Sequence, residues 1–175
     1  ASYYDHAATG NIRIVKTDAI DGSSLAGAVF EIRASGDIVR PDGSIAALDG
    51  ETVATVTTDE TGEARADNLP LGLGTARYEA VETQAPAGFL LDRTTHIVDL
   101  TYADQKTPVV EARLNVSDDY TKVDISKVDA SGEQEVEGAQ LTLYGPDKTE
   151  IDSWTSSDKP HRVEHLAPGT YSSVS

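Results

Sequence analysis

Short runs of β-branched and aromatic residues, separated by turn signals, constrain this chain more than any other feature of its sequence. The runs cover residues 11–16, 28–33, 51–58, 76–82, 95–101 and 108–116. They are rich in the residue types that strands favour, and DG, TG and PAG sequences that suit tight turns lie between them. No window of helical length shows a sustained 3.6-residue apolar period. The pattern predicts an all-β fold, built as a sandwich or barrel rather than as a parallel sheet.

An internal repeat sets the domain organisation. IVKTD at 14–18 recurs as ISKVD at 125–129, and LAGAVFEI at 25–32 recurs as VEGAQLTL at 136–143. Both pairs lie 111 residues apart without a gap, so the chain contains two copies of one unit. We expect a tail over 1–10, a first domain over 11–119 and an incomplete second domain over 120–175. The first copy is longer by about 14 residues, which we place in a surface hairpin within 34–50.

Charge and composition exclude several functional classes. The net charge of −16 argues against nucleic-acid binding, and no apolar run approaches the ~18 residues of a membrane span. The absence of cysteine excludes disulfides, thiolate metal sites and a cysteine nucleophile. His161 and His165 lie between prolines without an obvious third ligand, so surface histidines are expected and no metal or other cofactor. Because methionine is absent even from position 1, we expect an excised piece of a longer protein.

Strand alternation points three ionisable side chains toward the interior. Successive strand residues face opposite sides, so a polar residue that shares the parity of its apolar neighbours faces the core. Lys16 in the first run, Glu82 in the fourth and Asp118 just after the last run all have this parity. Asn115 has the opposite parity and is expected to point outward.

Burial of these three groups favours condensation chemistry. Burial lowers the pKa of a lysine and raises that of a carboxyl group. A neutral amine is a nucleophile, and contact with a protonated carboxyl gives an effective concentration of roughly 10⁵–10⁸ M. A second carboxyl bonded to the acceptor's carbonyl oxygen would stabilise the tetrahedral intermediate and relay protons, a role that suits Glu82. The alternative is a buried ion network with no covalent product.

The residues at 78–89, YEAVETQAPAGF, together with the upstream NLPLG, resemble the E-box of Cna B-type domains. These domains, also called SpaA-like or prealbumin-like pilin domains, occur in Gram-positive surface proteins. IVKTD and LAGAVFEI resemble the first two strands of the family, and residues 121–171 resemble the start of another such domain. The resemblance implies an Ig-like, prealbumin-like Greek-key β-sandwich, with one complete domain and a partial second copy in tandem.

The resemblance also implies an isopeptide bond between a first-strand lysine and a last-strand asparagine or aspartate, assisted by the E-box glutamate. Lys16 matches the lysine and Glu82 the glutamate. Face parity and the spacing to the next lysine favour Asp118 as the acceptor, with Asn115 as the runner-up. Lys127 matches the lysine in the second copy, which has neither an E-box glutamate nor an acceptor strand. We expect Lys127 to be unreacted in a copy that is either truncated or completed by another chain.

The function implied is that of a structural stalk or pilin-type module of an extracellular, cell-wall-anchored protein. The self-crosslinking reaction turns over once, so no enzyme is expected. Neighbouring domains of the same protein are the expected partners. The alternative is an adhesin module that binds a host or matrix ligand through the 34–50 insertion or the acidic surface.

Overall fold

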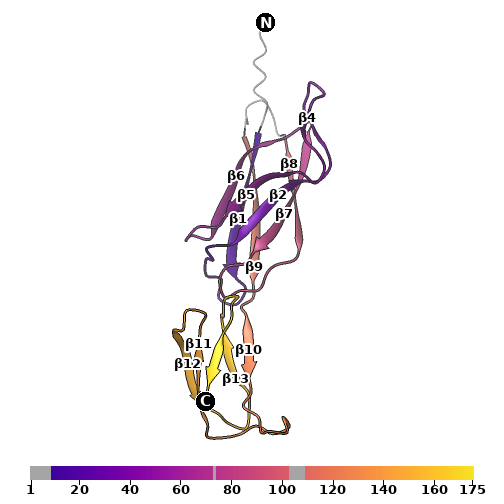
Figure 1. Ribbon diagram of the computed structural model, residues 1–175. Coiled ribbons are helices and arrows are strands. Elements are labelled where there is room, and N and C mark those ends of the chain that lie inside the picture. The colour runs from indigo at the N-terminus through magenta and orange to yellow at the C-terminus, as the bar shows by residue number, and fades with distance from the viewer. Residues whose placement is uncertain (1–8, 73, 103–108) are drawn as a thin grey trace. The chain divides into compact units, whose positions relative to one another are not determined.

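The computed structural model describes residues 9–72, 74–102 and 109–175. Every regular element assigned within these ranges is a strand, which confirms the all-β class. None of the described segments is a helix long and apolar enough to cross a membrane. Contacts divide the chain into two units: residues up to 86 with 90–119, and 87–89 with 120–175 (Figure 1). Residues 1–8 of the expected tail and residue 108 of the last predicted run lie outside the described residues.

The first unit contains two main sheets and a small hairpin. One sheet has the order β6-β1-β9 and the other the order β5-β2-β7-β8, while β3 pairs with β4. The strands are β1 (Thr9–Asp18), β2 (Val29–Ala34), β3 (Ile38–Val39), β4 (Ile45–Ala47), β5 (Thr52–Thr57), β6 (Glu63–Pro70), β7 (Thr75–Gln84), β8 (Thr95–Thr101) and β9 (Val109–Asp118). The first and last strands, β1 and β9, are parallel neighbours.

The core of this unit lies between the two main sheets. Burial alternates along β1, β2 and most of β7, because one side of each strand faces the opposite sheet. Both sheets contribute to one apolar cluster, whose larger members are Ile12, Ile14, Phe30, Ile32, Ile38, Leu69, Leu71, Tyr78, Val98, Leu100 and Val116. The arrangement is the β-sandwich expected from the sequence.

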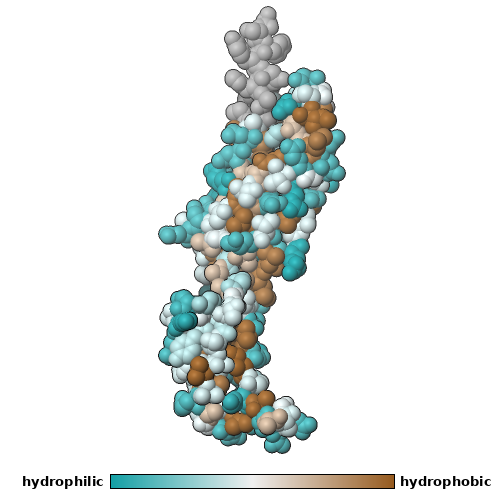
Figure 2. Space-filling view, viewed as in Figure 1, coloured by the Kyte–Doolittle hydropathy of each residue, from teal (hydrophilic) through white to brown (hydrophobic). Residues whose placement is uncertain are grey.

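The insertion at 34–50 forms a hairpin whose base belongs to the core. β3 and β4 pair antiparallel, as a hairpin requires. Ile38 and Ala47 are buried in the apolar cluster, whereas Ile45 and Leu48 are exposed to 50% and 55%. Figure 2 shows brown, hydrophobic atoms at the end of the unit that carries β4. The expected surface hairpin is therefore anchored in the core at its base and exposed at its tip.

The second unit repeats the start of the first. Its strands are β10 (Lys122–Ile125), β11 (Gln140–Tyr144), β12 (Glu150–Thr155), β13 (His161–Glu164) and β14 (Ser172–Val174), in sheets of order β10-β13 and β12-β11-β14. The amide of Leu25 donates to the carbonyl of Lys16 at 3.0 Å, and the amide of Val136 donates to that of Lys127 at 2.7 Å. The 111-residue repeat is thus a repeat of backbone geometry.

A buried hydroxyl holds the connection before the second strand in each unit. Thr58 Oγ1 donates to the carbonyl of Leu25 at 2.8 Å and accepts from the amide of Ala28 at 3.0 Å. Ser156 makes the same two bonds at the matching positions of the second unit. In each unit, one hydroxyl therefore forms hydrogen bonds with a backbone amide and a backbone carbonyl that have no partner in the sheets that the structure describes.

Replacing Thr58 with valine should destabilise the first unit by about 1–3 kcal/mol, because it keeps the side-chain shape and leaves a buried amide and a buried carbonyl unpaired. Urea unfolding measures this change. Thr57→Val is the matched control, since Thr57 is the exposed neighbour on β5 and should show little change. Equal midpoints for the two variants would contradict the role assigned to the hydroxyl.

Candidate functional site

β1 delivers Lys16 to the interior at its C-terminal end. The side chain follows Ile12 and Ile14 on the buried face and is 0% exposed. The amide of Lys16 donates to the carbonyl of Gly62 at 2.8 Å. Gly62 has a φ of 77°, and a Cβ at this position would lie 2.6 Å from the carbonyl oxygen of Lys16. The turn before β6 can close on the lysine because glycine stands there.

β9 brings Asp118 beside the lysine. In the parallel register, Lys16 is opposite Val116 and Asp18 is opposite Asp118. Asp118 shares the inward face of Val116 one side-chain step further along the strand, within reach of the long lysine side chain. Lys16 Nζ donates directly to Asp118 Oδ1, and the aspartate side chain is 1% exposed.

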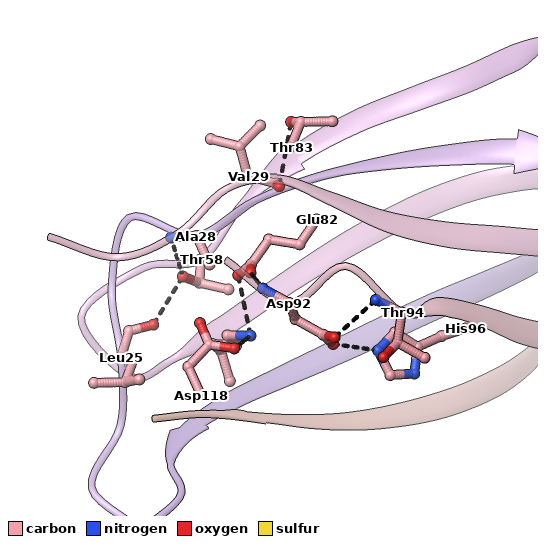
Figure 3. A network of polar contacts seen from close by, with 11 residues as sticks. Leu25, Ala28, Val29, Thr58, Glu82, Thr83, Asp92, Thr94, His96 and Asp118 are labelled. Atoms are coloured by element: carbon pink, nitrogen blue, oxygen red, sulfur yellow. Dashed lines mark hydrogen bonds and ion pairs between the residues drawn. The ribbon is translucent and has the colours of Figure 1, made fainter. Parts of the chain in front are cut away.

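Glu82 reaches the same point from the opposite sheet. It lies on β7, paired with Phe30 of β2, and its side chain is 0% exposed. Glu82 Oε1 lies 3.0 Å from Lys16 Nζ, while Oε2 accepts a hydrogen bond of 2.7 Å from the amide of Asp92. Figure 3 shows Glu82 and Asp118 pointing toward one another from different strands. The Phe30 ring centroid lies 5.4 Å from Lys16 Nζ and shields the amine on one side.

The electrostatics of the site favour protonated carboxyl groups. Burial raises the pKa of Glu82, and this effect outweighs the lowering effects of the Asp92 amide and of the nearby Lys16 ammonium group. Burial likewise raises the pKa of Asp118 against the lowering effect of Lys16. Asp118 raises the pKa of Glu82, whereas Glu82 lowers the pKa of Asp118. The two carboxyl groups therefore titrate as a pair.

Two buried oxygens at the site make no hydrogen bond among the described residues. They are Glu82 Oε1, which Lys16 Nζ approaches without hydrogen-bond alignment, and Asp118 Oδ2. A buried acceptor without a hydrogen bond costs roughly 1–3 kcal/mol. A proton on Glu82, shared with Asp118, would satisfy both oxygens. The arrangement therefore holds an amine, an acid and a second acid in mutual contact and away from solvent.

The other predicted residues lie elsewhere. Asn115 is exposed on the outer face of β9, where its side-chain oxygen accepts from Arg113 Nε at 3.0 Å. Lys127 is half-buried in the second unit, and its Nζ donates to the hydroxyl of Ser175 at 3.3 Å. Asn115 is thus not brought to Lys16, and the contact of Lys127 is to a hydroxyl rather than to a carboxylate.

The histidines of the second unit contact other side chains of that unit. His161 stacks on Trp154 with ring centroids 4.3 Å apart and bonds Asp152 at 2.7 Å. His165 stacks on Tyr120 with centroids 4.6 Å apart. Within residues 9–72, 74–102 and 109–175, no three acidic, histidine or cysteine side chains form a group that could hold a metal ion.

A supporting pair behind Glu82 was not anticipated from the sequence. Asp92 lies between β7 and β8, and its carboxylate accepts from the amide of Thr94 at 2.9 Å and pairs with His96 Nε2 at 2.6 Å. Burial raises the pKa of Asp92, but the bonds from His96 and Thr94 lower it below its ordinary value. Loop residues have no alternation, so only the shared parity of His96 with the buried Val98 offered a sequence signal.

Comparison with known proteins identifies a family and a fold. The model of the SpaA prealbumin-like fold domain matches residues 10–114 and 121–174. No curated protein matches the chain. The structure of the Bacillus anthracis TIE protein is 25% identical over 95% of this chain and 28% of that chain, with a TM-score of 0.50.

Two further similar structures are those of pilins. A streptococcal ancillary pilin is 23% identical over 95% of this chain and 53% of that chain, with a TM-score of 0.46. The shaft pilin SpaA of Lactobacillus rhamnosus GG is 19% identical over 95% of this chain and 86% of that chain, with a TM-score of 0.49. The chain spans about a quarter of the TIE structure and about half of the ancillary pilin structure.

Proposed function

Because the chain belongs to the SpaA prealbumin-like fold family, we propose that it is a structural, pilin-type segment of a Gram-positive surface protein, held by an isopeptide bond between Lys16 and Asp118. The observation that carries the proposal is the direct contact of Lys16 Nζ with Asp118 Oδ1, inside a core that excludes water, beside Glu82. Its expected location is the outside of the cell, as part of the cell wall or of a pilus.

The reaction is a condensation that needs no other molecule. A proton passes from the ammonium group of Lys16 to Asp118, which gives a neutral amine and a carboxylic acid. The amine nitrogen attacks Cγ of Asp118, and the C–N bond forms as Glu82 donates a hydrogen bond to the carbonyl oxygen. Glu82 then takes a proton from nitrogen and returns one to the departing hydroxyl, so one amide and one water are formed.

The choice of Asp118 over Asn115 rests on the faces of β9. Asp118 is buried and touches the amine, whereas Asn115 is exposed and bonded to Arg113. An asparagine acceptor would release ammonia and an aspartate acceptor water. The two alternatives therefore predict different products.

The bond would serve a structural role because it ties the first strand of the unit to the last. The reaction turns over once and leaves no free site, so the chain is not expected to act as an enzyme. Neighbouring domains of the same surface protein, or other pilus subunits, are the partners that this role implies. Lys127 is expected to stay unreacted while a hydroxyl is its partner.

A second candidate function is that of an adhesin that binds a host or matrix ligand through the insertion. The observation that favours it is the exposure of Ile45, at the start of β4, and of Leu48, just after β4. Exposed single aliphatic residues are common on soluble domains, so this observation supports the adhesin less strongly than the buried site supports the structural role.

Intact mass spectrometry tests the proposal. The purified chain should weigh one water less than its sequence requires, and Asp118→Ala should restore the full mass because the acceptor carbon is lost. Asn115→Ala is the matched control and should keep the deficit. A deficit of one ammonia that disappears in Asn115→Ala would move the acceptor to Asn115, and a full-mass wild type would contradict any crosslink.

A further inference from the structure

Among the described residues, Glu82 is held in place by a loop that contacts neither Lys16 Nζ nor the Asp118 carboxyl group through a hydrogen bond. The segment between β7 and β8 folds back so that the amide of Asp92 donates to Glu82 Oε2 at 2.7 Å. This bond occupies one carboxyl oxygen and leaves the other, Oε1, toward Lys16. The orientation of the glutamate therefore depends on where the loop places one backbone N–H group.

The side chain of Asp92 fixes that part of the loop. One carboxylate oxygen accepts from the amide of Thr94 at 2.9 Å and the other pairs with His96 Nε2 at 2.6 Å. His96 is on β8, opposite Ala80 of β7, so it belongs to the same sheet as Glu82. Figure 3 shows the chain of contacts from His96 through Asp92 to Glu82. The pair is mostly buried, with side-chain exposures of 22% for His96 and 16% for Asp92.

The same residues form the wall of a hollow that reaches the acceptor. A solvent-open hollow of about 360 Å³ is lined in part by Asp92, Thr94, His96 and Asp118. Condensation at Asp118 would release a water molecule, and Asp118 is one of the residues that line this hollow. The negative charge of Asp92 also raises the pKa of Asp118, which favours the acid form required for condensation.

We propose that His96 is a positioning residue for the Lys16–Asp118 condensation, acting through Asp92 to hold the backbone amide that orients the Glu82 carboxyl group. This inference rests on the proposed isopeptide bond and deepens it. His96 touches neither the amine nor the acceptor, so its effect is on the rate of bond formation rather than on whether the bond can form. Small displacements of a catalytic group reduce rates by as much as about a hundredfold.

The test follows bond formation in time. The full chain is synthesised in a cell-free reaction, samples are quenched in acidic denaturant, and intact mass gives the fraction that has lost water. His96→Leu, which cannot bond Asp92, should slow the reaction roughly ten- to a hundredfold. His96→Gln carries an amide nitrogen that can reach the carboxylate and should recover most of the wild-type rate. A merely structural histidine would not be rescued in this way.

A matched control exists in the second unit. His161 pairs with Asp152 at 2.7 Å, as His96 pairs with Asp92, but it belongs to the other copy. His161→Leu should leave the rate unchanged. If His96→Leu fails to fold, Asp92→Asn keeps the test open: it removes the charged acceptor of the histidine bond and should also slow the reaction.

The outcomes separate this inference from the proposed function. A wild-type chain that never loses water contradicts the isopeptide bond itself. A wild-type chain that loses water, with a folded His96→Leu variant that reacts at the same rate, leaves the bond standing and overturns the positioning role. Equal slowing of the leucine and glutamine variants also overturns it, because the hydrogen bond would then not be the cause.

Discussion

Glu82→Ala should lower the thermal midpoint of the first unit by on the order of 15–30 °C. Without the glutamate the amide should not form, and the unfolded chain regains the freedom of a loop that closes over 102 residues. By analogy with disulfides, closing a loop of this length contributes about 4–5 kcal/mol through the entropy of the unfolded state. For a unit of about this size, each kcal/mol corresponds to several degrees in midpoint. Scanning calorimetry measures the shift.

Glu79→Ala is the matched control for this prediction. Glu79 is three residues away on β7, points to the other face and makes one long side-chain bond of 3.3 Å with Ser35. This variant should keep the mass deficit and most of the wild-type midpoint. A Glu82→Ala variant that kept its midpoint while losing the deficit would show that the crosslink adds no stability.

Lys16→Met should make the stability of the first unit fall steeply as the pH rises. The variant forms no amide and leaves Glu82 and Asp118 buried without a cation, and a buried charge without a partner costs about 3–5 kcal/mol. Burial raises the pKa of both carboxyl groups, and the opposing effect of the lysine is lost in the variant.

The direction of this pH dependence follows from where the protons are held. The folded protein keeps protons that the unfolded chain releases near its ordinary pKa values of 4.5 for the glutamate and 3.8 for the aspartate. Stability is therefore full below those values and is lost as the pH rises through the raised folded-state pKa values. The slope reaches at most about 1.4 kcal/mol per pH unit for each group.

Urea unfolding between about pH 4 and pH 8 measures the effect. The control carries Lys16→Met together with Glu82→Gln and Asp118→Asn, which replaces both acids by neutral groups of the same shape. Its stability should depend far less on pH. If Lys16→Met were as stable at high pH as at low pH, the two carboxyl groups would not titrate inside the core.

The two-residue alternation of apolar and polar side chains was enough to predict the strands in which this alternation is clear. β1, β2, β7 and β9 lie close to their predicted ranges, and the inward parity of Lys16, Glu82 and Asp118 agrees with their burial. β6 was not among the predicted runs, because EARADNLP contains neither β-branched nor aromatic residues. It forms because its backbone pairs with β1 and its alanines fit beneath the opposite sheet.

Residues outside the strands could not be predicted in the same way. Asp92 contacts Glu82 through its backbone amide, and nothing in the sequence indicates where a loop amide will point. The anchoring of the 34–50 hairpin depended on Ile38 and Ala47, whose burial is decided by the sheets around them rather than by local pattern. Contacts between separate segments determine both features.

The parallel register of β1 and β9 has a mechanical consequence. Ten residue pairs join the strands, from Thr9 with Val109 to Asp18 with Asp118. A force that pulls the start of β1 away from the end of β9 acts along the strands, so the interstrand hydrogen bonds are sheared together instead of being unzipped one after another. With an amide between Lys16 and Asp118, the load path would cross directly from β1 to the last residue of β9. The chain between these two residues would then carry no tension.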